Sequence, residues 1–103
     1  MEIKEAQKKV DELINHYGGY WNPLSQFARL VEETGELSRA LNIKFGEKKS
    51  KFTGDGKEIE KEIADCAFAI IALCNYLKID LDKELEEKIA HDWEKCKGVY
   101  DKS

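Results

Sequence analysis

Apolar residues recur every three or four positions in four separate stretches of the chain, which is the spacing of one buried helix face. The stretches cover about residues 2–17, 23–45, 57–77 and 81–97. The pattern therefore predicts an all-α fold of four helices. The apolar positions of the fourth helix are Leu81, Leu85, Ile89, Trp93 and Cys96, and we expect Trp93 to be a core residue.

Turn and capping residues stand where these helices are expected to begin and end. Gly18-Gly19 ends the first helix, and Asn22 followed by Pro23 is a favourable start for the second. Gly46 ends the second helix, and Asp80 can cap the fourth. The polar, lysine-rich segment 46–56 predicts a mobile connection that is long for a helical hairpin.

The third helix is apolar on nearly every side from Ile63 onward, which is typical of a helix that is buried all round. We expect one flank to face the core of the same chain, namely Ile63, Cys66, Ile70, Leu73 and Leu77. Phe68 and Ile71 lie on another flank, and four short helices cannot easily cover it. The sequence therefore predicts a homo-oligomer, a homodimer or homotetramer, with Phe68 in the subunit interface.

Length, charge and cysteine content narrow the class of protein. The chain has 103 residues, which fits one domain over 1–103, and its net charge of −4 argues against nucleic-acid binding. The longest apolar-rich run, 63–77, carries Asp65 and is too short to span a membrane, and the first residues do not have the pattern of a signal peptide. Three cysteines without a CxxC pair predict reduced thiols and a cytoplasmic location.

Two pairs of carboxylates carry the candidate chemistry. Glu33 and Glu36 are three residues apart, as are Glu62 and Asp65, so each pair projects from one side of its helix. Antiparallel packing of the second and third helices would gather all four at the edge of the core. Four anions so close repel one another, so they must share protons or hold hard divalent cations such as Mg²⁺. A cation there would neutralise phosphate oxygens and acidify water for attack on phosphorus.

The sequence Glu32-Glu33-x-x-Glu36, followed after 25 residues by Glu62-x-x-Asp65, resembles the signature of the MazG-type all-α NTP pyrophosphohydrolases. The likeness extends to Asn22-Pro23 before the first motif and Ile79-Asp80 after the third helix. It implies a four-helix bundle-like fold with antiparallel helices and hydrolysis of an NTP or dNTP between the α- and β-phosphates. It also implies Mg²⁺, with Mn²⁺ as a substitute. It leaves three roles open: house-cleaning of the nucleotide pool, broad NTP hydrolysis, or a pathway substrate such as phosphoribosyl-ATP.

The resemblance implies residue roles. Glu33, Glu36, Glu62 and Asp65 fall on the Mg²⁺ ligands, and either Glu33 or Glu36 is expected to assist as catalytic base. Lys88 and Lys95 fall near positions that contact phosphate and sugar, although Asp92 stands where the family often has Asn.

Trp21, in the turn before the second helix, is expected either to stack on a base or to plug the end of the hairpin. For the neighbouring Tyr20 we favour a structural role.

Two rival interpretations follow from the helical pattern. A di-iron carboxylate bundle uses Glu-x-x-His ligand pairs, and neither His16 nor His91 stands three residues after a Glu. A non-enzymatic helical dimerisation module with an incidental acidic face explains the apolar third helix. It does not explain two matched carboxylate pairs.

Overall fold

The structure is a computed structural model that describes residues 1–46 and 57–98, and four helices make up the regular structure of these residues. They are α1 (Ile3–His16), α2 (Pro23–Phe45), α3 (Glu58–Tyr76) and α4 (Leu81–Cys96). The expected all-helical class is confirmed. Residues 47–56, where the mobile connection was predicted, lie outside the described residues.

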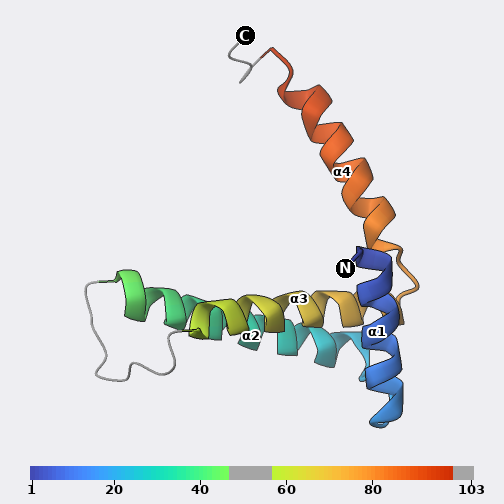
Figure 1. Cartoon of the computed structure of the whole chain (residues 1–103), viewed down its shortest axis with the longest axis vertical. Coiled ribbons are helices and arrows are strands. Elements are labelled where there is room, and N and C mark those ends of the chain that lie inside the picture. The colour runs from blue at the N-terminus through green and yellow to red at the C-terminus, as the bar shows by residue number, and fades with distance from the viewer. Residues whose placement is uncertain (47–56, 99–103) are drawn as a thin grey trace.

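The four helices are arranged around an antiparallel pair. Figure 1 shows α2 and α3 running side by side in opposite directions, with α1 crossing one end of the pair. The last helix, α4, extends away from this pair, beyond the N-terminal end of α1. None of the helices in the described residues is long and apolar enough to cross a membrane.

The helix ends follow the local signals in the sequence. The side chain of Asn22 accepts a hydrogen bond from the backbone N–H of Ser25 at 2.9 Å, and Asp80 accepts one from Lys83 at 3.2 Å. Each carboxylate or amide oxygen satisfies an N–H that has no partner within its helix. Gly18 has a φ of 112°, which other residues rarely adopt, and so it allows the chain to turn after α1.

A small polar network joins α1 to the turn between α3 and α4. The side-chain amide of Gln7 donates to Asn75 Oδ1 and to the carbonyl of Ile79, both at 3.0 Å. In return, Asn75 donates to the backbone carbonyl of Gln7 at 2.9 Å, and Gln7 Oε1 accepts from the N–H of Leu81 at 3.1 Å. This exchange fixes the crossing of α1 over the end of α3.

The interior of the single chain is built from small side chains. Among the described residues, the buried apolar ones are Cys66, Ala69, Ala72 and Cys74, all on α3. Cys66 was expected on the core flank, but Ala69 and Ala72 lie on the strip that carries Glu62 and Asp65. The face of α3 that carries Glu62 and Asp65 is thus partly the face that packs against the rest of the chain.

Two expectations about burial are therefore wrong for the single chain. Ile63, Ile70 and Leu77 are exposed rather than in the core, because α3 packs through the face that carries Ala69 and Ala72. Trp93 is 77% exposed rather than buried, because α4 extends away from the other helices. Phe68, predicted to lie on an uncovered flank, is half-buried.

Candidate active site

Three carboxylates from two helices come together at the α2–α3 contact. Glu33, Glu62 and Asp65 each offer an oxygen atom, and these oxygens all lie within 4.8 Å of one another. The three-residue spacing of Glu62 and Asp65 places both on the side of α3 that faces Glu33. The structure thus brings together three of the four carboxylates predicted from the sequence.

Glu36, the fourth predicted carboxylate, lies nearby but outside this group of three. It is exposed on α2, three residues beyond Glu33, and its negative charge helps to raise the pKa of Glu62. Its charge therefore reaches the cluster although its oxygen atoms are not among the converging ones.

Glu62 combines burial with nearby negative charge. Its side chain is half-buried, and Oε2 is buried without a hydrogen-bond partner. Burial raises the pKa of Glu62, and the charges of Asp65, Glu33 and Glu36 raise this pKa further. A buried, unpaired carboxylate oxygen is costly unless a proton or a cation compensates it. The donor set therefore fits a hard divalent cation bound by Glu33, Glu62 and Asp65.

Cys66 lies buried directly after Asp65. Burial, together with the charges of Glu33, Glu62 and Asp65, raises the pKa of this thiol. The thiol therefore stays protonated near neutral pH and acts as a small apolar residue beneath the carboxylates.

Arg29 links the carboxylates to an aromatic side chain. Its Nε lies 3.3 Å from Oε1 of Glu33, and its guanidinium carbon lies 5.8 Å from the centre of the Trp21 ring. The Arg29 charge offsets part of the repulsion around Glu33 and attracts the face of the indole. Arg29 was not among the residues predicted from the sequence, although its four-residue spacing from Glu33 is a helical ion-pair signal.

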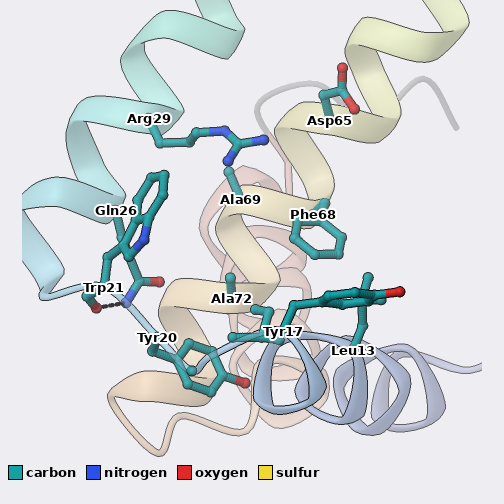
Figure 2. A pocket seen from close by; sticks show the side chains of 12 residues that line it. Leu13, Tyr17, Tyr20, Trp21, Gln26, Arg29, Asp65, Phe68, Ala69 and Ala72 are labelled. Carbon is teal, nitrogen blue, oxygen red and sulfur yellow. Dashed lines mark hydrogen bonds between the residues drawn. The ribbon is translucent and has the colours of Figure 1, made fainter.

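A pocket of about 330 Å³ opens beside Asp65, between the end of α1, the turn before α2, and α3 (Figure 2). Its walls are mainly apolar and aromatic. Asp65, and Arg29, which contacts Glu33, line the side of the pocket next to the carboxylate cluster. The lining residues are Leu13, Ile14, Tyr17, Gly19, Tyr20, Trp21, Gln26, Arg29, Asp65, Phe68, Ala69 and Ala72. Because Asp65 belongs both to the pocket and to the carboxylate cluster, the two form one continuous site.

Gln26 is the buried polar residue of this pocket. It is 7% exposed, its Nε2 donates to the backbone carbonyl of Trp21 at 2.7 Å, and its Oε1 is buried without a partner. Gln26 was not among the residues predicted from the sequence, although a signal was present. Gln26 lies on the same stripe of α2 as Leu30 and Leu37, where an apolar residue is expected.

The two aromatic residues of the turn have different environments. The hydroxyl of Tyr20 donates to Oδ1 of Asp11 at 2.5 Å, and burial together with Asp11 raises the pKa of Tyr20 to about 12. Its hydroxyl thus ties the turn to α1, which agrees with the structural role that we favoured. Trp21 is 57% exposed and lines the pocket, so its ring is available to a ligand.

Lys88 and Lys95, predicted to contact substrate, both lie exposed on α4. Nζ of Lys88 is 2.8 Å from Oδ2 of Asp92, and the pKa of Asp92 is lowered by Lys88 and His91. Because α4 extends away from α2 and α3, one chain does not bring these lysines to its own carboxylates (Figure 1).

Comparison with known proteins places this geometry in context. The family model of the MazG nucleotide pyrophosphohydrolase domain matches residues 22–102. The protein YpjD of Bacillus subtilis (strain 168) is 42% identical over 90 residues, which are 86% of this chain and 80% of YpjD.

Two solved structures are similar as well. The crystal structure of YpjD from Bacillus subtilis matches with a TM-score of 0.79 and 40% identity, over 90% of this chain and 95% of that one. The crystal structure of the MazG protein conserved in Bacillus, a nucleotide pyrophosphohydrolase, matches with a TM-score of 0.73 and 36% identity, over 99% and 95%. These similarities confirm the resemblance drawn from the two carboxylate motifs.

Proposed function

The chain belongs to the MazG nucleotide pyrophosphohydrolase family, whose members are hydrolases of nucleotide pyrophosphate bonds, and we propose that its substrates are nucleoside triphosphates. The reaction would cleave an NTP or dNTP between the α- and β-phosphates, giving a nucleoside monophosphate and pyrophosphate. The observation that carries this proposal is the convergence of Glu33, Glu62 and Asp65 beside an apolar pocket. The rival interpretation, a non-enzymatic dimerisation module, does not account for the family.

In this proposal Glu33, Glu62 and Asp65 hold Mg²⁺, with Mn²⁺ as a substitute, and Glu36 completes the ligand set. The unpaired, buried Oε2 of Glu62 supports it, because a cation supplies the charge that this oxygen atom lacks. When bound, the cation neutralises phosphate oxygens and acidifies water. Glu33 or Glu36 accepts the proton of the attacking water, whose oxygen bonds to the α-phosphorus as the bond to the bridging oxygen breaks.

Arg29 and the pocket position the rest of the substrate. Arg29 holds Glu33 in place at 3.3 Å. The apolar pocket receives the nucleoside. Because Asp65 lies at the edge of the pocket, the phosphates of a bound nucleotide would lie beside the carboxylates and the cation that they hold. Substrates of this kind suit an enzyme that removes unwanted nucleotides from the cytoplasmic pool.

We also propose that the working form is a homodimer or homotetramer. Large apolar side chains are exposed on all four helices of the single chain, for example Leu13 on α1, Leu24 on α2, Ile70 on α3 and Trp93 on α4. Leaving a large apolar side chain in water forgoes roughly 1.5–3 kcal/mol of burial free energy. A second copy would cover these stripes, and its α4 would bring Lys88 and Lys95 to the carboxylates of the first copy.

Product analysis tests the proposed reaction. The wild type, incubated with Mg²⁺ and a panel of NTPs and dNTPs, should release pyrophosphate and the monophosphate, as resolved by ion-exchange chromatography. Addition of EDTA should stop the reaction. Nucleoside diphosphate and orthophosphate as the first products would contradict the proposed bond cleavage.

A further inference from the structure

The amide of Gln26 has a fixed orientation at the base of the apolar pocket. The backbone carbonyl of Trp21, 2.7 Å away, can only accept a hydrogen bond, so the NH₂ group of Gln26 must face it. Oε1 is therefore held on the opposite side. Figure 2 shows this oxygen turned into the space between α2 and α3, away from the dashed bond to Trp21.

An acceptor fixed in this way lacks the partner that burial demands. Gln26 is 7% exposed, and its Oε1 is buried without a hydrogen bond. A buried carbonyl oxygen left unpaired costs about as much as a lost hydrogen bond, and such a group in a native structure calls for a ligand or a water. The surrounding walls, which include Trp21, Phe68 and Ala72, offer mainly apolar surface.

The geometry points to Gln26 as the residue that reads the nucleobase. We infer that its Oε1 accepts a hydrogen bond from an N–H group on the inward edge of the base, while Trp21 and Phe68 contact the faces of the ring. This inference rests on the proposed function. It adds that the site selects bases that carry a hydrogen-bond donor on the edge inserted into the pocket, such as an exocyclic amino group or the N–H of a ring imide.

The pocket and the carboxylates suit one molecule of this kind. Asp65 belongs to both, so a ligand with its base at Gln26 extends toward Glu33 and Glu62 at its other end. An apolar helix from another copy of the chain would fill the walls but would leave Oε1 without a partner. A site built to hydrogen-bond a substrate N–H discriminates strongly against an analogue without it, because its own polar group is then left unpaired.

Nucleotide pairs that differ in the donor test this inference. Three pairs differ only in an exocyclic amino group: dATP and purine deoxyribonucleoside triphosphate, dCTP and its 2-pyrimidinone analogue, and dGTP and dITP. For a ring imide, dTTP is paired with its 2,4-difluorotoluene analogue, which lacks the N–H group and also has fluorine in place of both carbonyl oxygens. For the base that the wild type prefers, removal of the donor should lower kcat/KM roughly 10- to 100-fold. In Gln26→Met, which keeps the length of the side chain, the two members of that pair should react equally well.

A binding measurement gives a second readout that does not depend on turnover. Trp93→Phe leaves Trp21 as the one tryptophan of the chain. Nucleoside monophosphates should then change the Trp21 fluorescence, and loss of the donor should weaken their binding by a similar factor. Ser25→Ala, on the exposed side of the same helix turn, is the matched control and should keep the preference.

The outcomes separate this inference from the proposed function. Equal binding and equal kcat/KM within every pair in the wild type would overturn the reading role of Gln26, even if pyrophosphate is released. Discrimination that persists in Gln26→Met would overturn it as well. Absence of pyrophosphate release from all substrates would defeat the proposed function, and the fluorescence titration would still test Gln26.

Discussion

Glu33 of α2 and Glu62 of α3 hold carboxylate oxygens within 4.8 Å of one another, close to the oxygen of Asp65. Arg29 contacts Glu33, whereas Oε2 of Glu62 has no hydrogen-bond partner. The repulsion among the carboxylates is therefore less compensated at Glu62 than at Glu33.

Glu62→Gln should stabilise the metal-free protein near neutral pH. Burial and the neighbouring carboxylates raise the pKa of Glu62 in the folded state above its ordinary value of 4.5. Below the unfolded pKa, Glu62 is protonated in both states and costs nothing. As the pH rises through the raised pKa, the wild type loses stability that the variant keeps. Urea denaturation in EDTA at about pH 4 and pH 7 should show an advantage of Glu62→Gln at the higher pH.

Glu60→Gln, an exposed position on α3, controls for removal of a negative charge. It should change the urea midpoint little at either pH. A Glu62→Gln variant less stable than the wild type at pH 7 would show that the carboxylate is compensated by a partner within the chain.

Mg²⁺ should raise the melting temperature of the wild type, and this increase should vanish when a ligand is removed. Glu33→Gln, Glu62→Gln and Asp65→Asn each take one oxygen donor of the cluster from the cation. We expect each to lower hydrolysis at least about 100-fold while helical circular dichroism is unchanged. Glu32→Gln, on the neighbouring exposed position of α2, should behave as the wild type.

The same experiment decides the role of Glu36. If Glu36 completes the ligand set, Glu36→Gln should lose the Mg²⁺-dependent increase in melting temperature together with activity. If it is the catalytic base instead, this increase should remain while activity falls. Full activity of Glu36→Gln would remove this residue from the site.

Gln7→Leu should destabilise the fold by about 2–4 kcal/mol, because it leaves groups of Asn75, Ile79 and Leu81 without partners. Chemical denaturation measures the loss. A double-mutant cycle with Asn75→Leu should be clearly non-additive, since the two side chains share their hydrogen bonds. Additive effects would mean that the exchange of hydrogen bonds contributes little.

The sequence predicted the features that depend on local chemistry. Asn22 and Asp80 cap the helices that they were expected to cap, because an N-cap depends on residues within one turn. The three-residue spacing of Glu62 and Asp65 also fixed a shared direction for their side chains.

Features that depend on how helices meet were harder to predict. Periodicity identified an apolar stripe on α4 with Trp93 in it, but a stripe does not say which surface covers it. For α3, which is apolar on several sides, the spacing of apolar residues could not show that the face with Ala69 and Ala72, rather than the flank with Ile63, is the one that packs. Gln26 was missed because its role arises from a contact with the carbonyl of Trp21, which a residue pattern does not contain.

The exposed stripe of α4 leads to the final prediction, that Trp93→Glu lowers the oligomeric state. Trp93 is 77% exposed within its own chain, so the substitution should cost the fold of the single chain little. In an oligomer, a partner buries this side chain, and an unpaired carboxylate there would be unfavourable. Light scattering coupled to size-exclusion chromatography should show the wild type as a dimer or tetramer and Trp93→Glu as a smaller species. Asn15→Glu, which adds the same charge at an exposed position of α1, should leave the oligomeric state unchanged. Because Lys88 and Lys95 would reach the carboxylates only from another copy, hydrolysis should fall together with assembly. An active monomeric wild type at micromolar concentration would contradict both the interface and the shared site.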